Sequence, residues 1–295
     1  MRPVKIVTDS CSDLAKDLRE KFDIDYLPMN TVMHGKEQPA SLDWESYSPS
    51  ELYDTIRGGE RVTTTQVPAA AFEEAFPQYL QDGFDVIYIA CSGKCSGSVN
   101  TAQMVADSIL PSFPGATIAC IDSLNASLGE GLVAIKAAQL RDEGLDAATI
   151  TETLLPLRNT VNMFVTVHNL NALKAAGRVK ASSAFFGNLL GVKPIIISDV
   201  NGDNVAYKKV KGRYNSIVEL VNLMADAIIE PEKQCIYIGH SDCLEEAKEL
   251  EALLKERIPE ADTYVGYIGP IIGASIGADA LAIFAFGEHV ERFSV

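Results

Sequence analysis

The sequence predicts an α/β fold with two domains, a parallel three-layer α/β/α domain over residues 1–158 and a mixed-sheet α/β domain over residues 159–295. Strands and helices alternate along the first half, which favours a parallel sheet with helices on both faces. A hairpin signal interrupts this alternation in the second half, and the chain is long enough for two domains of ordinary size. The boundary is expected within residues 155–162, where no linker rich in proline or glycine marks it.

The first half of the sequence is a series of strand–helix units. Residues 84–90 are a continuous apolar run, typical of a parallel strand that is covered on both faces. Ser12 is a residue type that begins helices, and Leu14 and Leu18 follow it at a spacing that places them on one helix face. The other elements expected here are strands at residues 4–7 and 117–121 and helices at residues 99–110 and 131–140.

The second half contains a predicted hairpin at residues 194–209. Asn201 and Gly202 stand at its tip, and both tolerate positive φ, so a tight two-residue turn is expected there. Antiparallel pairing of this kind predicts a mixed sheet. The other elements expected here are strands at residues 163–167, 235–239 and 263–268 and helices at residues 216–229 and 244–257.

The composition excludes several classes of partner. The formal net charge is −15, from 40 acidic and 25 basic residues, and such a charge repels nucleic acids and anionic membrane surfaces. No apolar stretch reaches the roughly 18 residues needed to span a bilayer, and no apolar segment headed by basic residues opens the chain. We therefore expect a cytoplasmic protein with no nucleic-acid partner and no stable membrane insertion.

Cysteine and histidine spacing predicts neither disulfides nor a metal site. Without a signal peptide, six scattered cysteines are expected to stay reduced. They form no CxxC pair, and the four histidines lie far apart with no ligand-like spacing. We predict no metal site and no cofactor.

Ligands of parallel sheets bind beyond the carboxyl ends of the strands, which directs attention to residues 8–13, 91–98 and 122–129. The loop at 91–98 is rich in serine and glycine, so its N–H groups and hydroxyls can face one anionic group. A plain strand-to-helix turn would have the same composition. The loop is not a P-loop, because that motif needs glycine at Tyr88 and a hydroxyl residue at Cys95.

The same loop supports an enzyme as the alternative function. Residues 93–97 match the G-x-[SC]-x-G elbow that displays a nucleophile, with Cys95 in the nucleophile position. This alternative is an α/β enzyme that acts on an ester or thioester. The opposing interpretation, which we favour, is that Cys95 is a small buried apolar residue, as free cysteines usually are.

A second polar loop precedes Pro68. Thr64, Thr65 and Gln66 offer several hydrogen-bond donors to a carboxylate or phosphate. A strand end whose hydroxyls bond the neighbouring backbone explains the segment equally well.

Two weaker patterns are also present. Asp9 and Asp13 are a candidate carboxylate pair, although Asp13 is expected in the first turn of a helix, where negative charge is favoured. Gly129 and Gly131 formally fit a dinucleotide-binding motif, but they lie about seven residues after the nearest expected strand. Close packing of the loop and the first helical turn explains these glycines more simply.

Taken together and in order, these segments resemble the DegV family over essentially the whole chain. Residues 8–14 are similar to the family's TDS-x-x-DL, residues 64–66 to its T-S-Q, and residues 92–98 with Thr101 and Ala102 to its S-S-x-L-S-G-T…S-A. Further matches are Asp122, Ser123, Ser127, Gly129 and Gly131 to D-S…S-x-G-x-G, Leu173, Gly177, Arg178, Leu190, Lys193 and Pro194 to L…GR…L-x-x-KP, and residues 209–213 to K-V-R-G-R.

The resemblance implies a ligand between two α/β domains, and that ligand is a long-chain fatty acid. Its carboxylate is expected to meet the hydroxyls of Thr64, Thr65 and Ser96 and the backbone of Gly97. The resemblance also implies a carrier, not an enzyme, that presents the fatty acid to a separate kinase for acyl phosphate formation. The full set of expected ligand-binding residues is Thr64, Thr65, Ser92, Gly93, Ser96, Gly97, Ser127 and Ser275.

Departures from the family pattern concern the head-group end. Gly93, Cys95 and Ser98 replace the second serine, the leucine and the threonine of S-S-x-L-S-G-T. The family often has H-T-G-P-G near its end, where this chain has residues 273–279 and only Ser275 remains to meet a head group. A basic cluster after the hairpin is expected to bind the partner, or else to be a solvated strand end: Lys209, Lys211 and Arg213.

Overall fold

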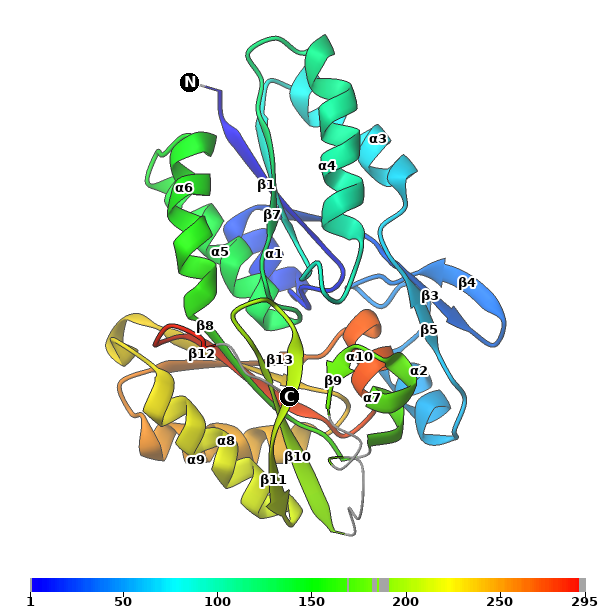
Figure 1. Cartoon of the computed structure of the whole chain (residues 1–295), viewed down its shortest axis with the longest axis vertical. Coiled ribbons are helices and arrows are strands. Elements are labelled where there is room, and N and C mark those ends of the chain that lie inside the picture. Colours follow the sequence, from blue (N-terminus) through cyan, green and yellow to red (C-terminus); the bar gives the residue numbers. More distant parts are fainter. Residues whose placement is uncertain (1, 169, 182–184, 186–190, 292–295) are drawn as a thin grey trace.

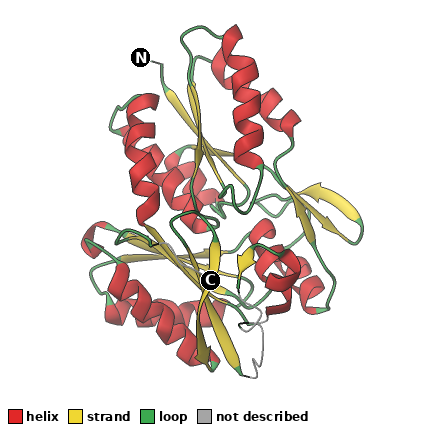
Figure 2. Cartoon of the chain, in the orientation of Figure 1, coloured by secondary structure: helices red, strands yellow, loops and turns green. Residues whose placement is uncertain are grey.

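The computed structural model describes residues 2–168, 170–181, 185 and 191–291. Its strands form a parallel sheet, a mixed sheet and a small antiparallel sheet, with helices between and outside the two larger sheets (Figure 1). The predicted α/β fold, with one parallel and one mixed sheet, is confirmed. Figure 2 shows the two larger sheets one above the other, with helices beside both.

The parallel sheet has the strand order β2-β1-β6-β7. Its apolar residues alternate between two cores, so helices cover both faces, α3 and α4 on one and α1, α5 and α6 on the other. The strands are β1 (Val4–Asp9), β2 (Ile24–Leu27), β6 (Asp85–Ala90) and β7 (Ile118–Asp122). The helices are α1 (Lys16–Phe22), α3 (Ala69–Gln81), α4 (Ser98–Ile109), α5 (Leu128–Asp142) and α6 (Ala147–Leu157).

The mixed sheet has the strand order β13-β12-β14-β8-β10-β11-β9, in which only the two outermost pairs are parallel. Helices α8 (Arg213–Ala227) and α9 (Leu244–Arg257) pack on one face, and α5 packs on the other. The strands are β8 (Val161–Thr166), β9 (Val179–Lys180), β10 (Val192–Ser198), β11 (Asn204–Lys211), β12 (Cys235–His240), β13 (Asp262–Tyr267) and β14 (Leu281–Phe286).

Helix α5 therefore lies between the two larger sheets. Nearly all of its first eleven residues are buried. Apolar residues occupy every side of this helix and not a single stripe, which is typical of a helix that is covered on all sides. A Cβ at Gly129 would lie 2.0 Å from Asn125 Oδ1, and one at Gly131 would lie 2.7 Å from Leu14 Cδ2. These contacts support the packing explanation of the two glycines.

A third group of elements lies beside the junction of the two larger sheets, at the right of Figure 1. It contains the antiparallel sheet β4-β3-β5 and helices that pack near it. The elements are β3 (Asn30–Met33), β4 (Lys36–Pro39), β5 (Thr63–Thr65), α2 (Pro49–Arg57), α7 (Leu170–Ala176) and α10 (Pro270–Ile276). Short 3₁₀ helices occur at Leu110–Ser112, Arg158–Thr160 and Pro231–Lys233.

The expected start of the first helix was wrong. Helix α1 begins at Lys16 after Ala15, so Ser12 does not cap it and Asp13 does not lie in its first turn. Asp13 instead has a φ of 53° and is buried, and its carboxylate accepts a hydrogen bond from Ser127. A tertiary partner thus explains this carboxylate better than the charge of a helix terminus.

The hairpin β10–β11 is confirmed, but its two-residue turn was wrong. The last paired residues are Ser198 and Asn204, so the loop covers residues 199–203. The Asp199 carboxylate accepts hydrogen bonds from the backbone N–H groups of Asn201 and Asp203, at 2.8 and 3.1 Å, and this contact widens the turn.

The mixed sheet starts, along the chain, with β8 at Val161. The division into domains at 158/159 stays a prediction. Among the described helices, none combines the length and the apolar character that crossing a bilayer requires.

Candidate functional site

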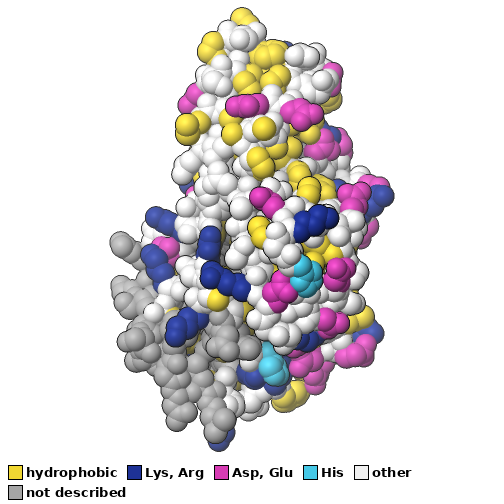
Figure 3. All heavy atoms as spheres, turned by 90° about the vertical axis from the view of Figure 1, so that its right-hand side faces the viewer, with side chains coloured by type: hydrophobic (Ala, Val, Ile, Leu, Met, Phe, Trp, Pro, Cys, Tyr) yellow, Lys and Arg dark blue, Asp and Glu magenta, His cyan; other side chains and the backbone are white. Residues whose placement is uncertain are grey.

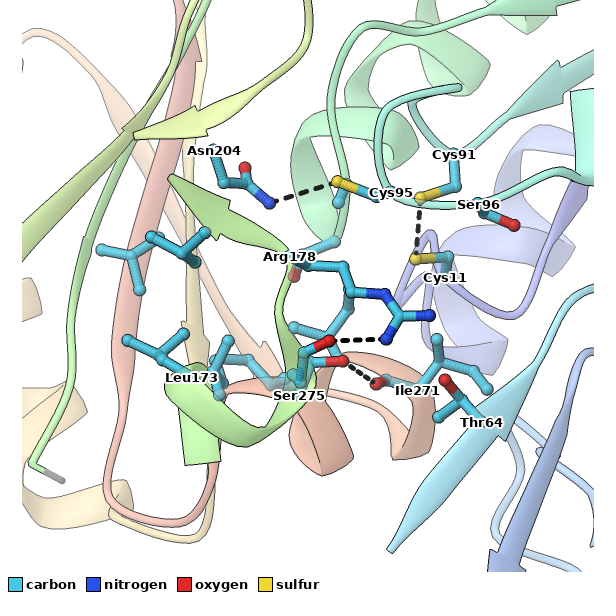
Figure 4. Close-up of a pocket in the computed structure, with 18 of the residues that line it drawn as sticks. Cys11, Thr64, Cys91, Cys95, Ser96, Leu173, Arg178, Asn204, Ile271 and Ser275 are labelled. Carbon is cyan, nitrogen blue, oxygen red and sulfur yellow. Dashed lines mark hydrogen bonds between the residues drawn. The ribbon is translucent and has the colours of Figure 1, made fainter. Parts of the chain in front are cut away.

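A cavity of about 200 Å³ lies where the two larger sheets and the third group of elements meet. Most of its wall is apolar and comes from β8, β10, β14, α7 and α10 (Figure 4). The aliphatic and aromatic lining residues are Met29, Ala126, Met163, Val165, Leu173, Ala176, Val179, Ile196, Ile268, Ile271, Ile272, Ile276, Ala282 and Phe284. Such a wall suits a hydrocarbon chain.

Polar groups from loops and helix ends line the rest of the cavity. They come from β5, from the loop between β6 and α4, and from the residues before α5. Six of the eight residues expected to bind the ligand border the cavity: Thr64, Thr65, Ser96, Gly97, Ser127 and Ser275. Their role in binding stays a prediction.

The other two expected residues, Ser92 and Gly93, are not among the lining residues. The Ser92 hydroxyl donates to the Gly202 carbonyl at 2.7 Å, which joins the 91–98 loop to the hairpin loop. The Gly93 N–H donates to Asp122 Oδ2 at 3.1 Å. Both residues therefore hold the loop in place in this structure.

The bordering hydroxyls differ in their partners. Thr65 donates to Glu37 at 3.2 Å, and Ser275 donates to the Ile271 carbonyl at 3.2 Å. Ser96 Oγ lies 3.0 Å from Ser98 Oγ, so the two hydroxyls share one hydrogen bond. The Thr64 hydroxyl has no hydrogen-bond partner within the described part of the chain, which leaves it available to a ligand.

Gly97 lies where the two polar loops touch. A Cβ at this position would be 2.2 Å from Gln66 Oε1, far inside van der Waals contact. Gln66 in turn donates from Nε2 to Thr101 Oγ1 at 2.6 Å. The glycine therefore lets the loop before Pro68 approach the start of α4, which brings Thr64 and Ser96 to the same cavity.

Arg178 is the one Lys or Arg residue that borders the cavity within the described ranges. It donates to the Ala176 carbonyl at 2.5 Å, and its guanidinium lies among the labelled side chains of Figure 4. Arg178 belongs to a Gly-Arg pair that resembles the family pattern, and it was not among the expected binding residues. A guanidinium can pair with a carboxylate through further N–H groups.

Cys95 lacks the environment of an activated nucleophile. A hydrogen bond with Cys91 and burial raise the pKa of the Cys95 thiol far above its usual range. Its sulfur also accepts a contact from Asn204 Nδ2 at 3.3 Å. Among the described residues that line the cavity, none is a histidine that could serve as the base. The structure thus offers no support for the Cys95 elbow as a catalytic site.

A buried group of thiols and carboxyls borders the same end of the cavity. Cys11 Sγ lies 3.2 Å from Cys91 Sγ, and a Glu130 oxygen lies within 4.8 Å of both sulfurs. Burial raises the pKa of Asp9 to about 6, and burial with the neighbouring Asp9 charge raises the pKa of Glu130. No sequence pattern indicates this group, because its members come from three segments that are far apart in the chain.

A second hollow of about 480 Å³ adjoins the cavity and shares Thr64, Ala176, Arg178 and Ser275 with it. It lies between α2, β5, α7 and α10. These elements are at the right of Figure 1, and Figure 3 shows the molecule from that side. Figure 3 shows both basic and acidic side chains on this face. The basic residues that border the hollow are Arg57, Arg61, His168 and Arg178.

The three residues expected to bind a partner do not form one free basic surface. Arg213 is largely buried and is paired with Glu246 at 2.6 Å, and it donates to the Asp279 carbonyl. Lys209 lies over the Phe185 ring at 4.9 Å, and Lys211 is exposed near the end of β11. Their role toward a partner stays a prediction.

The fold and the site define a class of protein: an α/β protein with an apolar cavity between two sheets and a polar end beneath two loops. The model of the DegV family, whose description is that of an uncharacterised protein family, matches residues 3–288. The chain belongs to the DegV family, as its sequence motifs predicted. A DegV domain-containing protein of Clostridium perfringens is 33% identical over 291 residues, covering 99% of this chain and 100% of the relative.

Solved structures share the fold. A DegV family protein from Thermus thermophilus, described as binding fatty acid, is 28% identical with a TM-score of 0.85, covering 97% of this chain and 100% of that one. DegV from Bacillus subtilis, described as a fatty acid binding protein, is 27% identical with a TM-score of 0.82, covering 98% of this chain and 100% of that one.

Proposed function

We propose that this chain binds one long-chain fatty acid, with its tail along the apolar wall and its carboxylate at Thr64, Ser96 and Arg178. The observation that carries the proposal is the cavity itself, which is lined mostly by apolar side chains and also by hydroxyls and one guanidinium. An amphipathic monocarboxylate matches this distribution. The fatty acid binding described for the Thermus thermophilus and Bacillus subtilis relatives supports the same ligand class.

The tail should supply most of the affinity. Burying each CH₂ contributes roughly 0.8 kcal/mol, so about fifteen of them give on the order of 12 kcal/mol before the entropic costs of binding. Each hydrogen bond to the carboxylate adds only about 1.5–3 kcal/mol. Thr64, Ser96 and Arg178 therefore act mainly to orient the ligand and to keep its carboxylate at the polar end.

The same proposal includes presentation of the carboxylate to a separate cytoplasmic kinase that forms the acyl phosphate. The second hollow supports this step, because it shares Thr64, Arg178 and Ser275 with the cavity and is bordered by Arg57, Arg61 and Arg178, as well as by Glu60 and Asp279. Positive charge at that position would favour the approach of a phosphoryl donor. The chain then supplies binding and orientation, and the bond-forming chemistry belongs to the partner.

Mass spectrometry of an organic extract tests the binding step. Protein purified from a bacterial host should release close to one fatty acid per chain after denaturation. A protein that is stoichiometrically empty, and that also fails to take up added long-chain fatty acids, would contradict the proposal.

A further inference from the structure

We propose that Cys11, Cys91 and Glu130 form a binding site for a divalent cation of the zinc type. One ligand atom of each residue lies within 4.8 Å of the other two, and all three residues are buried. The fold brings them together from three places: Cys11 follows β1, Cys91 follows β6, and Glu130 lies in the first turn of α5.

Neighbouring groups hold these side chains in position. The Asp9 carboxylate accepts hydrogen bonds from the backbone N–H groups of Cys11 and Cys91, at 2.9 and 3.4 Å, and from the Tyr88 hydroxyl at 2.7 Å. The Thr8 hydroxyl donates to Glu130 Oε1 at 2.8 Å. Hydrogen bonds from outside the ligand set are typical of metal sites, because they orient the ligands before the ion binds.

An independent observation points to a ligand at this place. The Glu130 side chain is 0% exposed, and its Oε2 atom has no hydrogen-bond partner within the described residues. A buried carboxylate oxygen without a partner is unfavourable, because nothing compensates for its loss of hydration. Because the Glu130 carboxylate lies beside both sulfurs, a cation bound there would give this oxygen a partner.

The buried carboxyl groups around this cluster also lack an ion-pair partner among the described residues. Asp9, Asp13 and Glu130 are all buried, and none of them is in an ion pair with a Lys, Arg or His of the described chain. Buried carboxylates are normally paired, protonated or bound to metal.

The donor atoms select the kind of ion. Two sulfurs with one oxygen suit zinc, cobalt or cadmium, whereas calcium and magnesium prefer oxygen ligands alone. Thiolates on one tetrahedral zinc ion lie about 3.8 Å apart, since each Zn–S bond is about 2.3 Å. The Cys11 and Cys91 sulfurs are 3.2 Å apart, so they would need to move slightly away from each other for one ion to bind both. Binding would displace both thiol protons.

The proposed metal site lies beside the cavity. Cys11 and Cys91 both border it, and Cys95 borders it beside them (Figure 4). A fourth position on the metal would therefore face the cavity. This inference departs from the sequence-based prediction of no metal site, and it does not depend on fatty acid binding.

Cobalt(II) titration of the metal-free protein under a phosphine reductant tests the proposal. One equivalent of cobalt should produce a sulfur-to-cobalt charge-transfer band that zinc abolishes. Cys91→Ser should lower the affinity by about 100-fold or more, and Thr8→Val by about 10–100-fold. Cys235→Ser is the matched control, because Cys235 begins β12 outside the cluster, and it should bind as the parent does.

Two results would overturn the proposal: no charge-transfer band at one equivalent, or an unchanged band in Cys91→Ser. If Cys91→Ser fails to fold, zinc-edge X-ray absorption of the parent decides instead. At least two sulfur ligands are expected there, and a shell of oxygen and nitrogen alone contradicts the site. The measurement is made on lipid-free and lipid-loaded protein, so failure of fatty acid binding does not affect its outcome.

Discussion

The Ser127 hydroxyl donates a 2.5 Å hydrogen bond to Asp13 Oδ2, which joins the loop after β1 to the start of α5. Both residues are buried, and Ser127 has a φ of 56°, a conformation that non-glycine residues rarely adopt. Ser127→Ala would remove the hydroxyl that donates to this oxygen. We expect a loss of about 1–3 kcal/mol in the free energy of unfolding.

Urea unfolding of Ser127→Ala measures this loss. Ser46→Ala is the control, since the Ser46 hydroxyl also donates a hydrogen bond, to the Pro39 carbonyl, but at an exposed site. The control should change stability by less than about 0.5 kcal/mol. If both substitutions lower the free energy of unfolding equally, the Ser127–Asp13 hydrogen bond stabilises the protein no more than an exposed one does.

Substitutions at the loop between β6 and α4 separate the carrier from the hydrolase alternative. Cys95→Ala should keep the bound lipid, because a carrier does not use the sulfur. Ser96→Ala combined with Thr64→Val should weaken retention by about 2 kcal/mol, a factor of about 30. The assays are lipid content and hydrolysis of activated esters. Ester turnover by the parent that disappears in Cys95→Ala would overturn the carrier proposal.

Arg178→Gln should weaken binding of the carboxylate but not of the tail. Because Arg178 is exposed, solvent screens its charge, and the expected loss of affinity for a fatty acid is about tenfold. The fatty alcohol of the same length serves as the matched neutral ligand, and its affinity should change by less than about threefold. Competition against a fluorescent fatty acid measures both dissociation constants. A similar loss for acid and alcohol would place Arg178 outside the head-group site.

His240 should make the protein less stable in mild acid. The side chain is 2% exposed, and burial lowers the pKa of His240 to about 4 from its usual 6.5. Between these values the unfolded chain binds a proton that the folded protein does not, so stability falls as the pH falls through this window. Relative to the parent, His240→Gln should lose less stability between pH 7.5 and pH 5, by up to about 2 kcal/mol.

Urea unfolding at the two pH values measures that difference. The exposed His289 provides the control, and His289→Gln should follow the parent at both pH values. If His240→Gln and the parent lose the same stability between pH 7.5 and pH 5, a neutral His240 in the folded protein is ruled out.

Sequence patterns predicted the parts of the site that depend on local chemistry. Thr64 lies in the short strand β5 and Ser96 in the loop before α4, and both border the cavity. The role of Ser92 depended on a partner 110 residues away, the Gly202 carbonyl, which no local pattern reveals. The sequence also did not indicate that Arg178 borders the cavity, because the other lining residues come from distant segments of the chain.

The thiol–carboxylate cluster shows the same limit of local patterns. Cys11 and Cys91 are 80 residues apart and meet because β1 and β6 are neighbouring parallel strands. Glu130 joins them because α5 packs on both strands. Ligand spacing along the chain predicted no metal site, since that test detects only ligands that are close in sequence.

Calorimetric titration of the lipid-free protein with saturated fatty acids of increasing length tests the central claim most directly. Binding should saturate at one fatty acid per chain. The dissociation constant should fall about fourfold with each added CH₂, until the tail fills the cavity, because each buried CH₂ contributes roughly 0.8 kcal/mol. Absence of saturable binding, or a dissociation constant that does not depend on chain length, would contradict the account.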